Sequence, residues 1–216
     1  VGALGSTITL TRRQKTLLSG EALINSQNLM TGQLSERQWR DVADAARTTI
    51  RMPEGQKEPS SRWKKRILLA EHSPIRKLTF SWKWINLPYW VSVHFVRHKF
   101  GIEHFVSTQR TDRTGADRTG ARQDAPVEHE CFANAAEVMF ISRRRLCAQA
   151  SPETREAWKM VLRELAGREP ELASCCVREC VYRGFCPEFK CCGFVDTKAF
   201  AEELAAYRRI PAPQKK

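Results

Sequence analysis

Apolar residues at helical spacing predict one helix in the first quarter of the chain and another beyond its middle. The first is predicted to begin at Ser35, which stands at capping-box spacing from Gln38. The second is predicted over residues 128–149. The residues expected to face the core are Trp39, Val42, Ala43, Ala46 and Ile50 in the first helix, and Phe132, Ala136, Met139, Phe140 and Leu146 in the second.

A third helix is predicted from its boundary residues as well as from its apolar face. Ser151 is a favourable N-cap, Pro152 suits the first turn, and Gly167 is expected to end the helix. Its core face would be formed by Ala157, Val161, Leu162 and Leu165. A short helix opening near Asp196 is predicted to close the fold.

Strict alternation of apolar and polar residues between Leu78 and Trp84 is typical of a strand with one buried face. Residues 86–88, with the sequence Asn-Leu-Pro, are expected to end this strand. The run that follows, residues 89–96, has two interpretations. Its β-branched residues favour a strand, whereas Pro88 would equally suit the first position of a helix.

The remaining segments suggest one domain with an N-terminal extension. Residues 1–34 show little periodicity and are interpreted as an arm or an irregular region, and residues 35–216 as a single domain. Residues 111–126 are polar and contain Asp-Arg-Thr-Gly twice, which predicts a long surface loop. Helices are expected to dominate around at least one strand.

An excess of positive charge narrows the range of partners. The 216 residues include 36 Lys and Arg against 24 Asp and Glu, a formal net charge of +12. Such a chain favours polyanions, either phosphorylated small molecules or nucleic acid. No apolar run approaches the roughly 20 residues that span a bilayer. The first residues do not have the charge order of a secretory signal, so we predict a cytoplasmic protein with no membrane partner.

Eight cysteines are many for a chain of this length, and six of them lie in residues 175–192. Without an export signal, free thiols or a metal site are favoured over disulfides. The favoured interpretation is free thiols packed around Phe185 and Phe189, so that no metal ligand is assigned. The alternative is a zinc ion or iron–sulfur cluster, for which Cys147 would complete a set with Cys180, Cys186 and Cys192.

The segment LPYWVSVHFVRHKFGIEHFVSTQR carries the clearest candidate chemistry. Arg97, His98 and Lys99 follow an apolar run directly, which would deliver three basic groups at the edge of the core. Desolvation there strengthens their attraction for an anion such as phosphate. Ser107 could donate a further hydrogen bond, and the guanidinium of Arg110 could bind two phosphate oxygens at once. The alternative is an exposed basic cap on a core element.

This segment resembles the signature of the flavin-dependent thymidylate synthases, in which an Arg-His-Arg triplet precedes a serine by seven residues. Here the triplet is residues 97–99 and the serine is Ser107. Residues 71–74, Glu-His-Ser-Pro, match the family's turn before a strand. Asn134 and Arg145 match residues of its late helix. The resemblance implies an α/β (α+β) fold, with helices packed on a small, mostly antiparallel sheet, and a homotetramer whose flavin sites several subunits build.

The resemblance also implies roles for individual residues. Those expected to bind the flavin, FAD, are His72, Ser73, Arg97, His98, Lys99 and Asn134. Those expected to bind deoxyuridine monophosphate (dUMP) are Arg97, Ser107 and Arg145. Arg110 is added to them because its guanidinium could bind phosphate, not because of the resemblance. Arg97, Ser107 and Arg145 would be the catalytic residues.

The implied reaction is reductive methylation of dUMP to thymidine monophosphate (dTMP). Methylenetetrahydrofolate would give the carbon, NADPH would reduce the flavin, and cationic side chains would stabilise the developing negative charge. Four departures from the family pattern leave an alternative open. Lys99 replaces an arginine, His94 replaces a glutamine, His104-Phe105 replaces Asn-Glu, and Arg110 stands one position late. The alternative is a non-catalytic or differently specific protein that binds nucleotides or nucleic acid on the same fold.

Overall fold

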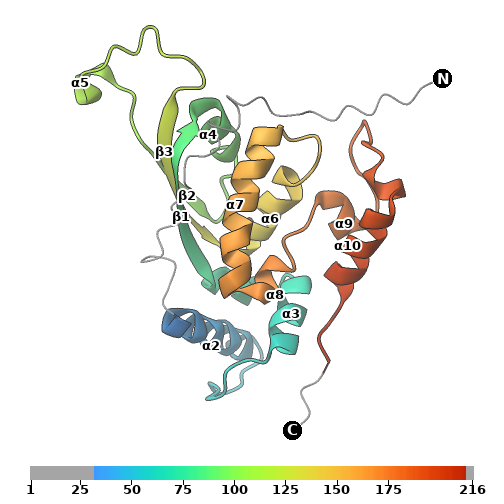
Figure 1. Ribbon diagram of the computed structural model, residues 1–216. Helices are drawn as coiled ribbons and strands as arrows, with labels where there is room; N and C mark the ends of the chain where they lie inside the picture. The colour runs from blue at the N-terminus through green and yellow to red at the C-terminus, as the bar shows by residue number, and fades with distance from the viewer. Residues whose placement is uncertain (1–31, 213–216) are drawn as a thin grey trace, which may run out of the picture.

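The computed structural model describes residues 32–212 (Figure 1). In chain order its elements are α2 (Gly32–Thr49), α3 (Ser61–Leu69), the 3-10 helix η1 (Ser73–Lys77), β1 (Thr79–Pro88), α4 (Tyr89–Phe95), β2 (Ile102–Val106), α5 (Thr111–Thr114), β3 (Pro126–Asn134), α6 (Ala135–Arg145), α7 (Pro152–Arg168), α8 (Pro170–Ala173), α9 (Glu179–Arg183), the 3-10 helix η2 (Phe194–Asp196) and α10 (Lys198–Arg208). No helix within residues 32–212 is long and apolar enough to cross a membrane.

Three antiparallel strands form the sheet, in the order β1-β3-β2. One face is covered by α4, α6 and α7, and α9 and α10 lie beyond α6 (Figure 1). The predicted apolar face of β1 is confirmed, since Leu78, Phe80, Trp82 and Trp84 are all buried. The coarse fold prediction, helices packed on a small antiparallel sheet, is therefore confirmed.

The first strand does not end at Asn86, as the sequence had suggested. Its pairing with β3 shifts between Trp84 and Leu87 and then resumes to Pro88. Asn86 takes up the irregularity with a φ of 57°, a left-handed conformation that asparagine tolerates better than most residues. The ambiguous run after it is helix α4, with Pro88 as its N-cap residue.

The helix predicted over residues 128–149 is wrong in its first part. Residues up to Asn134 belong to β3, the central strand, and only α6 is helical. The alternation of buried and exposed positions explains the difference, because Val127, His129, Cys131 and Ala133 are buried. Phe132 lies on the other face and is 45% exposed, so it is not a core residue of a helix.

The first described helix begins earlier than predicted. Helix α2 starts at Gly32, so Ser35 lies inside the helix rather than at its N-cap, and residues 32–34 are helical. Residues 1–31 of the predicted arm lie outside the described residues. Gln38 accepts a hydrogen bond from the backbone N–H of Thr79 through its side-chain oxygen at 2.9 Å. Ile50, predicted to be buried, lies past the end of the helix and is exposed.

Helix α7 confirms the prediction made from its boundary residues. The Ser151 hydroxyl accepts a hydrogen bond from the backbone N–H of Thr154, and the helix ends at Arg168, one residue beyond the predicted Gly167. Its buried face includes Trp158, whose indole lies edge-on to Trp82 with ring centroids 5.6 Å apart. This aromatic contact joins α7 to the sheet. Near Asp196 the predicted short helix is η2 followed by α10.

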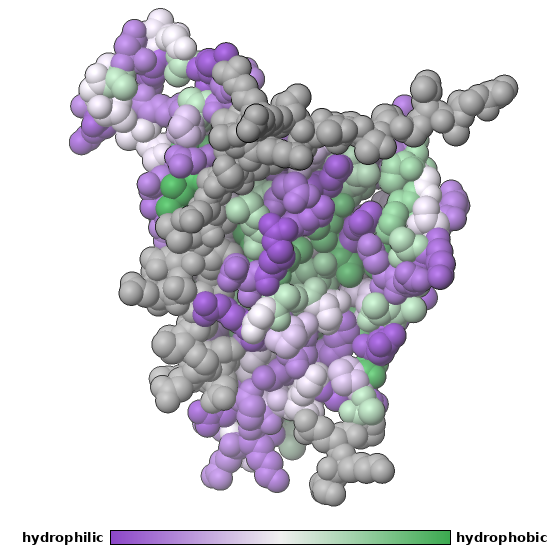
Figure 2. All heavy atoms as spheres, in the orientation of Figure 1, coloured by the Kyte–Doolittle hydropathy of each residue, from purple (hydrophilic) through white to green (hydrophobic). Residues whose placement is uncertain are grey.

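The predicted long surface loop is also confirmed. Every residue from Arg110 to Gln123 is exposed, and α5 is its only helical turn within the described residues. The loop projects from the body of the protein at the upper left of Figure 2, where most of its surface is hydrophilic or neutral. Two local ion pairs, Arg110 with Asp112 and Arg122 with Asp124, lie at its two ends.

Candidate anion-binding site

Arg145, in the last turn of α6, forms a hydrogen bond with the last turn of α4. Its Nη2 donates a hydrogen bond to the backbone carbonyl of His94 at 2.5 Å, and its Nε donates to Nε2 of His98 at 3.0 Å. Burial lowers the pKa of this guanidinium, and Arg97 and Arg144 lower it further. Basic side chains at the C-terminal end of α6 complement the helix dipole. Both contacts aim the guanidinium toward the basic triplet.

Arg97 adds a second guanidinium that has no partner among residues 32–212. Its side chain is exposed and forms no ion pair or hydrogen bond there. Burial lowers the pKa of His94, and the charges of Arg145 and Arg97 lower it further, while Glu153 opposes them. His94 therefore stays neutral at pH 7, and its Nδ1 lies 2.8 Å from the hydroxyl of Thr154.

His98 lies beneath these guanidiniums and is only 5% exposed. Because Arg145 donates to its Nε2, the neutral ring carries its proton on Nδ1. That nitrogen lies 3.2 Å from Oε1 of buried Glu137, without the alignment of a hydrogen bond. Glu137 is fixed in turn, since its backbone N–H donates to Oδ1 of Asn134, the N-cap of α6. Asn134, Glu137, His98 and Arg145 thus form one connected series.

Several residues singled out from the sequence lie outside this series. Ser107 follows β2 on the exposed face of the sheet with Phe105, and its hydroxyl accepts a hydrogen bond from the backbone N–H of Glu128 at 2.9 Å. Arg110 is held by both carboxylate oxygens of Asp112. Neither Ser107 nor Arg110 bonds to the guanidinium group of Arg97 and Arg145 within the described residues.

Three predicted flavin-binding residues are exposed and stand apart. His72 is the N-cap of η1 and Ser73 its first residue, and His72 borders a groove between α2 and α3 together with Arg66. Lys99 is exposed in the turn between α4 and β2. The sequence placed these residues around one ligand. Within residues 32–212, the contacts link Asn134, His98, Arg97 and Arg145, whereas the side chains of His72, Ser73 and Lys99 form no hydrogen bond with this group.

Gly101 allows the chain to turn closely past Asn134. Its φ is 77°, and a Cβ atom there would lie 2.3 Å from Nδ2 of Asn134. We expect Gly101→Ala to lower the free energy of unfolding by about 1–3 kcal/mol, from backbone strain and displacement of the α6 N-cap. Urea denaturation would measure it. Gly115→Ala is the matched control, because Gly115 has a φ of 72° with nothing within 4 Å. An equal loss in both variants would contradict the role of Asn134.

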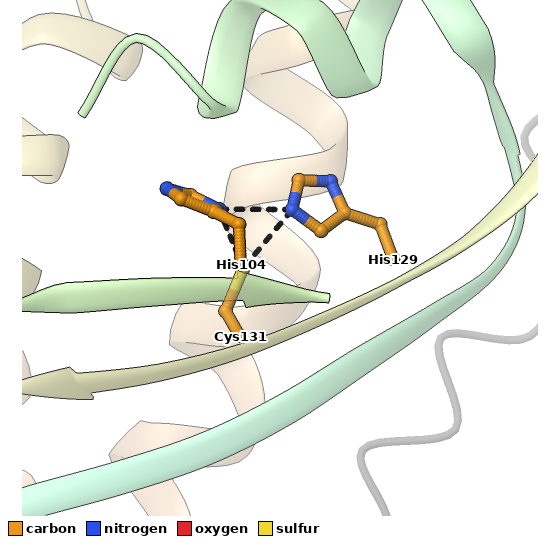
Figure 3. Close-up of side chains that lie close together, drawn as sticks. All are labelled: His104, His129 and Cys131. Atoms are coloured by element: carbon orange, nitrogen blue, oxygen red, sulfur yellow. Dashed lines mark hydrogen bonds between the residues drawn. The ribbon is translucent and has the colours of Figure 1, made fainter. Parts of the chain in front are cut away.

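A second polar cluster lies between the sheet and α4 (Figure 3). His104 of β2 stands opposite Cys131 of β3, and His129 lies on the same face two residues away. His104 Nδ1 is 2.9 Å from His129 Nε2, and the Cys131 sulfur is 3.4 Å from both nitrogens. All three ligand atoms lie within 4.8 Å of one another, close enough to hold one metal ion.

One arrangement of protons satisfies every ring nitrogen of this cluster without a metal. Ser92 donates to Nδ1 of His129, His129 donates through Nε2 to His104, and His104 donates through Nε2 to the backbone carbonyl of His98 at 2.9 Å. Burial, followed by the charge of His104, lowers the pKa of His129 to about 4. Burial raises the pKa of the Cys131 thiol. At neutral pH the cluster therefore holds the backbone of His98 in place.

The sequence did not single out His129, Cys131 or Glu137. His129 and Cys131 could have been found from the alternation of residues 127–133, which places both side chains on the same face of a strand. Comparison of the sequence with models of known protein families finds no match, and neither does comparison with curated proteins.

Proposed function

We propose that the chain is a flavin-dependent enzyme that methylates dUMP to dTMP, using methylenetetrahydrofolate and NADPH. The observation that carries this proposal is the group of Arg97, Arg144 and Arg145, which forms no ion pair with a carboxylate among residues 32–212. Guanidinium groups bind phosphate oxygens in pairs, and both dUMP and FAD carry phosphate. The donor set therefore fits these ligands.

The chain's own residues would bind and orient the anion. Arg145 is held in place by His98 and by the His94 carbonyl, so little conformational freedom remains for a ligand to remove. Arg97 is exposed and would close on the phosphate. FAD, when bound, would supply the hydride. Ser107, on the exposed sheet face, would complete the site of a neighbouring copy in the homotetramer.

Substitution of Arg97 tests the phosphate site with little risk to the fold, because the side chain is exposed. We expect Arg97→Met to weaken dUMP binding by about 10- to 100-fold, the loss of one charged hydrogen-bonding group. Calorimetric titration of dUMP would measure it. Arg163→Met, at an exposed arginine of α7, is the matched control and should leave affinity unchanged. Equal affinity in both variants would contradict the site.

FAD binding and methylation of dUMP can be tested directly. Purified protein incubated with FAD and passed through a desalting column should retain the yellow flavin spectrum, and tritium should be released from C5-labelled dUMP on addition of methylenetetrahydrofolate and NADPH. A colourless protein that takes up no FAD would contradict it.

A nucleotide- or nucleic-acid-binding protein without turnover is the second candidate. It is favoured by Phe105, an exposed residue of β2 that stands where the resembled family has an acid. Binding of dUMP or of single-stranded DNA, weakening with salt and without tritium release, would select this candidate.

A further inference from the structure

Five cysteines from three parts of the chain line one largely enclosed cavity, on the side of α6 that faces α9. Cys147 lies just past the end of α6, and Cys180 lies in α9. Cys186, Cys191 and Cys192 belong to the loop between α9 and η2. All five are free thiols. The fold therefore brings cysteines that are far apart in the sequence, from Cys147 to Cys192, to the lining of one cavity.

The contacts around the cavity confirm that these thiols are neighbours. Cys180 interacts electrostatically with Cys147 and Cys186, and Cys186 lies within hydrogen-bonding reach of Cys191. The side chain of Gln149 donates a hydrogen bond to the backbone carbonyl of Lys190 at 2.8 Å. This bond joins the segment after Cys147 to the segment before Cys191, so both sides of the cavity are fixed.

Backbone N–H groups point at three of the sulfurs. Gly193 donates to the sulfur of Cys191 at 3.4 Å, two residues back along the chain. Glu188 donates in the same way to Cys186, and Val181 donates to Cys180. Gly193 has a φ of 79°, which glycine adopts without strain and which allows this tight turn. Hydrogen bonds to the ligand sulfurs are among the features that set the reduction potential of an iron–sulfur cluster.

The two remaining cysteines of the segment behave differently. Cys175 and Cys176 are 1% and 7% exposed and belong to the hydrophobic core. Burial raises the pKa of Cys176 to about 12, so this thiol stays protonated. Phe185 and Phe189 are both exposed, which contradicts the interpretation that the cysteines pack around them. Packing therefore accounts for Cys175 and Cys176, and in part for Cys180 and Cys186, which also contact the core, but it leaves Cys147, Cys191 and Cys192 unexplained.

The spacing of the thiols distinguishes a cluster from a single ion. Four thiolates on one zinc ion, with Zn–S bonds of about 2.3 Å, lie about 3.8 Å apart. Among residues 32–212, the only three ligand atoms within 4.8 Å of one another are those of His104, His129 and Cys131. The cavity thiols are thus spread more widely than one ion requires. An iron–sulfur cluster spaces its cysteine ligands over several iron atoms.

We infer that Cys147, Cys180, Cys186 and Cys191 hold an iron–sulfur cluster in this cavity. Cys191 is assigned in preference to Cys192 because the N–H of Gly193 is directed at its sulfur. Cys186 is followed by Pro187, as the last cysteine of bacterial ferredoxin runs is followed by proline. Cys192 is the spare thiol of the set.

The test is the metal content of the full chain, purified without oxygen and reconstituted with iron and sulfide. We expect iron and acid-labile sulfide in about equal amounts, a broad visible absorption and an electron paramagnetic resonance signal after reduction with dithionite. Zinc in place of iron at full occupancy, or neither metal, would overturn the inference.

Two adjacent substitutions make the ligand assignment specific. Cys191→Ser should lose most of the iron and the visible absorption, whereas Cys192→Ser should keep both. Both residues are exposed, so neither substitution threatens the fold, and circular dichroism would verify this. Iron retained in Cys191→Ser, or lost equally from Cys192→Ser, would overturn the assignment. These readouts do not depend on flavin or dUMP, so they stand or fall separately from the proposed enzyme activity.

Discussion

Trp158→Ala is expected to lower the free energy of unfolding by about 3–5 kcal/mol, the usual range for removing a fully buried tryptophan. Trp158 is fully buried on α7. Its ring contacts Trp82 and Phe95, with centroids 5.6 and 6.1 Å away, and its Nε1 donates to the Ser142 hydroxyl at 2.9 Å. The alanine variant would leave a cavity between the sheet and the helices and would remove one hydrogen bond of the Ser142 hydroxyl, which still donates to the Val138 carbonyl.

Urea denaturation followed by far-ultraviolet circular dichroism would measure this loss. Trp158→Phe keeps an aromatic ring and should lose less than the alanine variant. Phe189→Ala removes a fully exposed ring and should change the free energy of unfolding by no more than about 0.5 kcal/mol. Similar losses in Trp158→Ala and Phe189→Ala would show that Trp158 does not join α7 to the sheet.

The second large effect is a loss of stability in mild acid. His129 is fully buried, and its pKa in the folded protein is lowered from 6.5 to about 4. In the unfolded chain the same ring takes up a proton below pH about 6.5. Its contribution to stability is therefore present above pH about 6.5 and is lost as the pH falls toward about 4. The shift corresponds to about 3 kcal/mol.

Comparison of variants separates this effect from the titration of carboxylates, which also begins below pH about 5. The free energy of unfolding would be measured by urea denaturation at a series of pH values from about 7 to about 4. This range covers the pKa of His129 in both the unfolded and the folded chain. His129→Gln should be less stable at neutral pH and should lose less stability on acidification. His72→Gln, at an exposed histidine, should keep the slope of the unmodified protein. A parallel slope for His129→Gln would contradict the assignment.

The elements predicted correctly are those whose signals are local. Alternation in β1 and the Ser151-Pro152 start of α7 each specify a conformation within a few residues. The error over residues 128–149 arose because Phe132 and the alanines after it also fit a helical spacing. Pairing of β3 with two other strands decided the conformation, and such pairing is set by tertiary contacts that a single segment does not contain.

The candidate site was predictable only in part for the same reason. The basic triplet could be read directly, and the resemblance to a known family supplied Asn134 and Arg145. The bonds from Arg145 to His98 and to the His94 carbonyl join residues about fifty positions apart, and they depend on how α4 and α6 pack. The link from Asn134 through Glu137 depends on where α6 begins, which the sequence had misplaced.

The strand order β1-β3-β2 has a consequence for how the protein is made. Neither β1 nor β2 has a hydrogen-bonded neighbour until β3, which ends at Asn134, has left the ribosome. Until then the Trp82 and Trp84 side chains have no sheet to join, and closing the intervening loop costs entropy. Synthesis of this chain therefore passes through a stage in which the apolar face of this strand is unprotected, and that stage is when a chaperone would have most to bind.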